Sequence, residues 1–129
     1  MLNDPLANAL SKIRNSEKLG ESSCIIRPIS NIIKRILVIM NEKGYIGENS
    51  VTEEAKGGKI NINLLGKINK CGAIKPRFTV KDGQFEFFEK RYLPAKGFGI
   101  LIVSTNQGIM THEEAKEKKI GGILLAYCY

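Results

Sequence analysis

Apolar positions in the first half of the chain follow the period of a helix in two places. In the first they recur every three or four residues, which predicts a helix over residues 3–15 with one apolar face, formed by Leu6, Ala9, Leu10 and Ile13. Asn3 or Asp4 is the expected cap, and Pro5 suits the first turn, where its missing N–H costs no hydrogen bond.

The second place with a helical period follows Ser30, which is the expected cap of a helix that ends near residue 42. This helix has a wide apolar face, which contains Ile32, Ile33, Ile36, Leu37 and Met40, with Asn31, Lys34 and Asn41 opposite.

Other segments of the first half have the pattern of strands. SCIIR at residues 23–27 is a short strand candidate, and another strand is expected to start at GYI, after Gly44 has ended the second helix. Residues 59–64 alternate strictly, with Ile60, Ile62 and Leu64 facing one way and Asn61 and Asn63 the other. Such alternation is typical of a half-buried strand. The first half is therefore predicted to run helix–strand–helix–strand–strand.

The second half favours strands. AIKPRFTV is a strand candidate that Pro76 would confine to an edge or a bulge. GQFEFFEK adds aromatic residues, and the continuous apolar run GILIV predicts a central strand. Thr111 and Glu114 match a capping box, so a short helix should follow and end at Gly121-Gly122, before a last strand, ILLAYCY. The expected fold class is α+β, with two small packed units at residues 1–66 and 67–129, the second mainly antiparallel β with one short helix.

Composition narrows the class of protein. The chain has 129 residues, 43% of them hydrophobic, and no apolar run near the roughly 20 residues that span a bilayer. The first residues lack the basic and apolar regions of a secretory signal, so we expect a cytosolic protein with no membrane partner.

The chain has three cysteines, Cys24, Cys71 and Cys128, which lie far apart. Their odd number and wide spacing argue against a metal knuckle and a disulfide framework. We expect Cys128 to be buried, and we expect no metal and no cofactor.

Charge is concentrated in the middle of the chain. The formal net charge is +7, and residues 67–96 hold eight Lys and Arg against three Asp and Glu, whereas residues 97–129 are balanced. This distribution is typical of a protein that meets a polyanion such as nucleic acid, although solubility alone also explains a basic surface.

Residues 97–111 contain no charge, and the stretch STNQ lies there between the central strand and the capped helix. Its hydroxyl and amide groups can bind base edges, phosphate oxygens or ribose hydroxyls, so Ser104, Thr105, Asn106 and Gln107 are candidate binding residues. The plain alternative is an ordinary connection. Gly121 and Gly122 fit a helix end and turn, but also a close approach by another molecule.

The tripeptide KRY is a second candidate. Lys90 and Arg91 could contact phosphate, and Tyr92 could stack on a base. The alternative is a solvated strand end with Tyr92 partly buried.

An enzyme is disfavoured. His112 is expected to be exposed at the first turn of a polar helix, with no assembled base for Ser104 or Thr105. GFG precedes its strand and no Gly-Lys-Ser/Thr occurs, so a phosphate loop is not predicted.

Three segments carry a family resemblance. GILIVSTNQGIMTHEEAKEKKIGGILLAYCY resembles the C-terminal signature of the universal small-subunit ribosomal protein eight family. DPLANALSKIRN is similar to the family's opening, and RPIS to its entry into the second helix, so the resemblance covers essentially the whole chain. RYLPAKGFGILIV looks more like archaeal members than bacterial ones.

The resemblance implies direct binding to the central domain of small-subunit ribosomal RNA and a role in subunit assembly. The implied partners are neighbouring small-subunit ribosomal proteins, and the chain is expected to be a monomer when free and to lie in the cytoplasmic small subunit. Some bacterial members also bind their own messenger RNA to repress its translation, so that messenger is a further candidate partner. It places Ser104, Thr105 and Asn106 at an irregular RNA region, with the glycine pair beside them. It assigns backbone contacts to the first unit, at Asn3, Asp4, Ser30, Asn31 and Lys34, with Lys56 and Lys59 as additions.

Two positions depart from the family pattern. Asn106 stands where serine is common, and Asn31 stands where lysine is frequent, so Lys34 or Arg35 would take over a phosphate contact. The rival hypotheses are a small hydrolase or transferase built on Ser104, Thr105 and His112, and a general nucleic-acid condensing protein.

Overall fold

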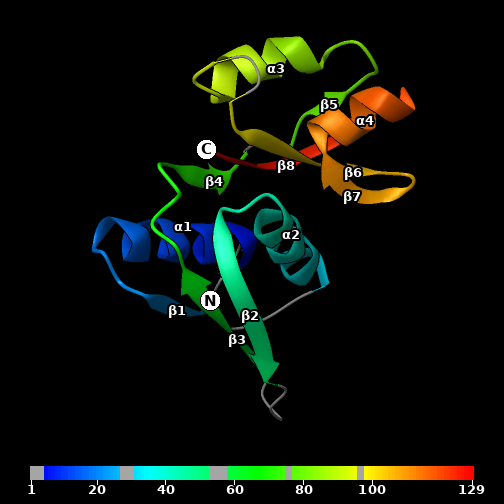
Figure 1. Ribbon diagram of the computed structural model, residues 1–129. Coiled ribbons are helices and arrows are strands. Elements are labelled where there is room, and N and C mark those ends of the chain that lie inside the picture. The colour runs from blue at the N-terminus through cyan, green and yellow to red at the C-terminus, as the bar shows by residue number, and fades with distance from the viewer. Residues whose placement is uncertain (1–4, 27–30, 53–57, 75–76, 96–97) are drawn as a thin grey trace. The chain divides into compact units, whose positions relative to one another are not determined.

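The computed structural model describes residues 5–26, 31–52, 58–74, 77–95 and 98–129, and Figure 1 shows its elements. The chain divides into two compact units, Met1–Asn69 and Lys70–Tyr129. The described part has four helices and two antiparallel sheets, one of three strands and one of five. The predicted fold class, α+β with a β-rich C-terminal part, is confirmed.

The first unit has two helices and one sheet. Its elements are α1 (Pro5–Lys18), β1 (Ser23–Ile26), α2 (Asn31–Glu42), β2 (Ile46–Thr52) and β3 (Lys59–Leu64), and the sheet order is β1-β3-β2. Pro5 begins α1, as expected for a residue with fixed φ and no N–H to donate. The predicted caps Asn3, Asp4 and Ser30 lie outside the described residues.

The core of the first unit lies on one face of this sheet. Ile60, Ile62 and Leu64 are buried, whereas Asn61 and Asn63 are exposed, as their alternation predicts. The helices contribute the residues that the apolar spacing identified, among them Leu10, Ile13, Ile33, Ile36 and Met40. One expectation about this face was wrong. Ile32 is 39% exposed, because it lies in the first turn of α2 at the margin of the buried face, and Ile39 is buried instead.

The second unit is organised around its last strand. Its elements are β4 (Cys71–Ala73), β5 (Thr79–Val80), α3 (Phe85–Tyr92), β6 (Ile100–Thr105), β7 (Gly108–Thr111), α4 (His112–Lys118) and β8 (Gly122–Cys128). The sheet order is β4-β8-β6-β7, and β5 also pairs with β8. β8 therefore has β6 along one side and both β4 and β5 along the other.

Three elements of the second unit differ from the sequence prediction. AIKPRFTV contributes to two short strands, β4 and β5, instead of one, and Ile74 and Phe78 also form backbone hydrogen bonds with β8. GQFEFFEK contains a helix, α3, that was not predicted, so the described part of this unit has two helices. The connection after β6 is a tight turn into a further strand, β7.

Both helices of the second unit pack on one core. Phe85 and Phe88 of α3 and Ala115 of α4 join residues of the sheet, which are Leu101, Val103, Met110 and Leu124. The apolar run of β6 is buried along residues 100–103, as expected for a strand with neighbours on both sides.

Candidate nucleic-acid interface

The tip of the β6–β7 hairpin is fixed from within. Ser104 and Thr105 are strand residues, and the turn itself consists of Asn106 and Gln107. The Thr105 hydroxyl donates to the Gly108 carbonyl over 2.8 Å and accepts from the Gln107 N–H over 3.1 Å. Gly108 has φ +114°, a conformation that favours glycine and that commonly follows such a turn. The expected connection from strand to helix therefore contains a further strand, β7, and the exposed side chains at the tip are Asn106 and Gln107.

The two glycines provide close packing inside the chain. A Cβ added to Gly122 would lie 2.4 Å from the Ser104 carbonyl oxygen, and one added to Gly121 would lie 2.3 Å from that of Val80. The prediction that they end the helix was wrong, because Lys119 is the C-cap, with φ +57°. In this structure the backbone that lies close to the two glycines belongs to Val80 and Ser104 of the same chain. As a result Gly122 lies directly beside Ser104, at the base of the hairpin tip.

KRY forms the last turn of α3 and not a strand end. Lys90 and Arg91 are exposed there, where cations stabilise the C-terminal end of a helix. The Arg91 guanidinium lies 5.2 Å from the centre of the Phe78 ring and 5.5 Å from that of Tyr92. Tyr92 is half-buried and stacks on Tyr127, with ring centres 5.6 Å apart. Lys90 is therefore the more available cation, and one face of Tyr92 is already covered.

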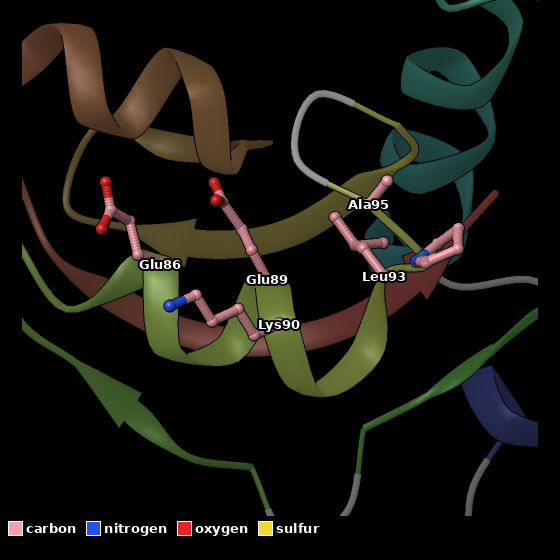
Figure 2. Close-up of a pocket in the computed structure, with 6 residues that line it drawn as sticks. Glu86, Glu89, Lys90, Leu93 and Ala95 are labelled. Carbon is pink, nitrogen blue, oxygen red and sulfur yellow. The ribbon is translucent and has the colours of Figure 1, made fainter.

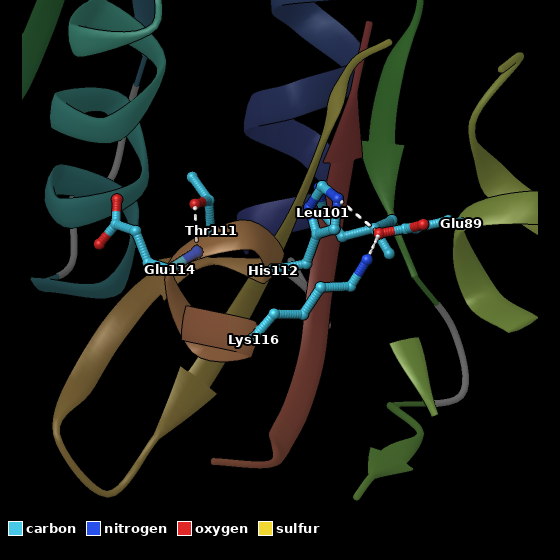
Figure 3. Close-up of polar contacts among 6 residues, drawn as sticks. All are labelled: Glu89, Leu101, Thr111, His112, Glu114 and Lys116. Carbon is cyan, nitrogen blue, oxygen red and sulfur yellow. Dashed lines mark hydrogen bonds and ion pairs between the residues drawn. The ribbon is translucent and has the colours of Figure 1, made fainter. Parts of the chain in front are cut away.

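His112 is buried, so the prediction of an exposed histidine was wrong. Only 2% of its surface is exposed, and its Nδ1 accepts the Leu101 N–H over 3.0 Å. Its Nε2 lies 2.9 Å from Oε1 of Glu89, a buried carboxylate of α3 (Figure 3). Lys116 Nζ donates to the same oxygen. This cluster of His112, Glu89 and Lys116 connects α3, α4 and β6.

The environment of His112 keeps the ring neutral. Burial lowers its pKa, and the nearby Glu89 and Glu113 carboxylates only partly oppose that effect. An Nδ1 that accepts a backbone N–H leaves Nε2 as the protonated nitrogen, which suits donation to Glu89. Both ring nitrogens are thus occupied, and His112 cannot activate Ser104 or Thr105. The helix start itself was predicted correctly, since the Thr111 hydroxyl accepts the Glu114 N–H over 3.3 Å.

Sequence reasoning missed this cluster, although one signal was available. His112 precedes Ala115 by three residues, so the two share a face of α4, and Ala115 is the only apolar residue of that helix. The buried face of α4 therefore includes His112. Glu89 could not have been found in this way, because α3 itself was not predicted.

A hollow of about 430 Å³ borders α3. Figure 2 shows its lining, which consists of Glu86, Glu89, Lys90, Leu93, Pro94 and Ala95. Glu86 and Glu89 point to the same side of α3, but Glu89 is already bound to His112 and Lys116.

Within the described residues no group of three or more acidic, His or Cys side chains could hold a metal. The described helices also include none that is long and apolar enough to cross a membrane.

The predicted residues of the first unit are spread over two elements. Asn31 is exposed at the start of α2, and Lys34 follows three residues later, half-buried. Lys59 begins β3 and is also half-buried. Asn3, Asp4, Ser30 and Lys56 fall outside the described residues.

Comparison with known families identifies the class of protein. Residues 4–129 match the family model described as ribosomal protein S8, so this is a ribosomal protein. The match covers nearly the whole chain, and the chain belongs to the ribosomal protein S8 family. As a member it is a component of the small ribosomal subunit, acts in translation and binds ribosomal RNA; the family is structural rather than enzymatic.

Proposed function

We propose that this chain binds the central domain of small-subunit ribosomal RNA through the tip of the β6–β7 hairpin. The observation that carries the proposal is the rigid, uncharged tip in a basic protein. Asn106 and Gln107 are exposed, while Thr105 holds the turn and Gly122 brings β8 against Ser104. Amide groups on a fixed backbone can hydrogen-bond base edges or ribose hydroxyls without first losing the freedom of a flexible loop.

Charge has a separate part in the proposal. Lys90 and Arg91 contact phosphates and supply affinity that depends on salt, and the hairpin tip selects the RNA. Asn31, Lys34 and Lys59 contact the RNA backbone from the first unit, together with Asn3, Asp4, Ser30 and Lys56. A-form RNA has a major groove too narrow for side chains, so the tip meets the minor groove or unpaired bases. Gly121 and Gly122 act mainly through the position they give to the tip.

Further parts of the proposal rest on the resemblance. The free chain is a monomer of the archaeal type that supports subunit assembly and packs beside neighbouring small-subunit proteins. Its own messenger RNA is a second ligand of the same surface. If so, that messenger competes with the ribosomal RNA in a binding assay, and Asn106→Ala weakens both.

The test is a competition between ribosomal RNA, random RNA and duplex DNA in a gel-shift assay over a range of salt. Asn106→Ala should weaken binding of the ribosomal RNA by about 1–3 kcal/mol, by analogy with a lost base contact, and leave random RNA unaffected. Lys90→Ala should weaken all RNAs and flatten the salt slope by roughly one unit. Equal binding of all three nucleic acids by the unmodified protein would instead identify a condensing protein.

A further inference from the structure

Phe87 is an exposed aromatic ring on a helix whose other rings are covered. Its exposed fraction is 65%, whereas Phe85 is fully buried, Phe88 is 9% exposed and Tyr92 packs on Tyr127. An edge-to-face contact with Phe88, with ring centres 5.1 Å apart, supports the ring from one side. α3 therefore presents a supported aromatic surface to solvent, in the most basic segment of the chain.

A hollow of about 600 Å³ lies beside this ring. Its lining consists of Gly83, Gln84, Glu86, Phe87, Phe88 and Lys90. Sites for small organic groups have volumes of this order. A Cβ placed on Gly83 would meet nothing within 4 Å, so the turn before α3 leaves this end open.

The polar groups around the ring suit a nucleotide. Lys90 follows Phe87 by three residues, a spacing that places both on one side of a helix. The Gln84 side-chain oxygen accepts the Lys81 N–H over 3.2 Å, which leaves its amide N–H groups as donors. Glu86 adds a carboxylate, which repels phosphate but accepts hydrogen bonds from the amino groups of bases.

We propose that Phe87 and Lys90 form a second RNA-binding site, in which an unpaired base stacks on the Phe87 ring and its phosphate contacts Lys90. The proposal rests on the RNA-binding function proposed above and adds a site apart from the hairpin tip. Aromatic rings bind single-stranded bases of any sequence because every base has a π-face. A protein partner fits less well, because protein docking needs a contiguous apolar patch, and four of the six lining residues are glycine, polar or charged.

The experiment uses the full chain and a transcript of the central domain of small-subunit ribosomal RNA. Phe87→Ala should weaken binding about 5- to 150-fold, the range for one lost base stack. Phe87→Tyr should bind as the unmodified chain does, and Phe87→Leu should lose most of the affinity, since leucine is apolar but has no π-face. The salt slope should stay constant in all three variants, in contrast to Lys90→Ala.

Phe98→Ala is the matched control, because Phe98 belongs to the same unit, is 50% exposed and does not line the hollow. It should bind normally. Ultraviolet irradiation of the complex should crosslink RNA to the peptide that contains Phe87, as mass spectrometry would show.

Three results would overturn the proposal. Unchanged binding by Phe87→Ala removes the site, and full binding by Phe87→Leu reduces it to a general apolar contact. A loss that occurs only when other ribosomal proteins are present identifies a protein partner. Failure of Phe87→Ala to weaken binding while Asn106→Ala still does so defeats this inference alone, whereas failure of the unmodified chain to prefer the transcript over random RNA defeats the proposed function.

Discussion

Replacing His112 with leucine should destabilise the second unit strongly, because the side chain is buried and both of its ring nitrogens have partners. The substitution removes the acceptor of the buried Leu101 N–H and one partner of the buried Glu89 carboxylate. Leucine keeps a side chain of comparable size, so the cavity left behind is small. The predicted cost is therefore mainly that of polar groups left without partners.

The structure allows this cost to be estimated. A buried backbone donor without an acceptor costs about 1–3 kcal/mol, and a lost hydrogen bond to a charged group costs about 1.5–3 kcal/mol. Lys116 remains on Glu89 and limits the second amount. The expected total is about 3–5 kcal/mol, a large part of the stability of an ordinary domain.

Urea unfolding followed by tyrosine fluorescence and circular dichroism measures this change. His112→Gln is the matched variant, because its amide can still accept from Leu101 and donate to Glu89, and it should cost less than His112→Leu. Adding Glu89→Leu to His112→Leu removes the unpaired carboxylate, so the double variant should be more stable than the two single effects predict. Strict additivity of the two substitutions would refute the explanation, since it would mean that His112 and Glu89 do not stabilise each other.

Three further predictions concern the same unit. Burial lowers the pKa of His112 below its value of about 6.5 in the unfolded chain, so the unfolded state binds the proton first as the pH falls. The free energy of unfolding should therefore decrease below about pH 6.5, by at most about 1.4 kcal/mol per pH unit. His112→Gln should flatten this pH dependence in urea titrations. Gly122→Ala should lower both the melting temperature and the affinity for ribosomal RNA, because its Cβ would lie 2.4 Å from the Ser104 carbonyl oxygen; a normal melting curve would refute the close packing. Thr111→Ala should cost about 1 kcal/mol through loss of the helix cap and more through loss of a buried methyl group, whereas Thr111→Ser keeps the cap and should cost less in the same unfolding assay.

Sequence reasoning succeeded where one period dominated. The alternation in β3 and the unbroken apolar run of β6 each match one type of strand, and both predictions are confirmed. It failed for FEFFEK, where two periods overlap. Phe85 and Phe87 alternate as in a strand, whereas Phe85, Phe88 and Tyr92 recur as on a helix, and only the second set packs against the sheet. Packing against the rest of the unit favours the helix over the strand, and that packing cannot be predicted from this segment alone.

The candidate site shows the same limit. The composition of the stretch STNQ drew attention to a segment that proves to be the end of β6 and a turn, but it did not predict the strand β7 that follows the turn. The burial of His112 depends on Glu89, which lies on another element. Likewise, Phe87 becomes a candidate only once Phe85 and Phe88 are known to be buried. Each of these properties arises from elements that are distant along the chain.

The position of β8 in the sheet has a consequence for biosynthesis. β8 pairs with β4, β5 and β6, yet it follows all of them along the chain. The five-stranded sheet, and with it the packing of Gly122 against Ser104, cannot be completed until residues 122–128 have left the ribosome that makes them. The first unit needs nothing beyond β3 for its own sheet and can fold much earlier during translation. A nascent chain would therefore complete the sheet that supports the proposed RNA-selecting surface only after its first unit is able to fold.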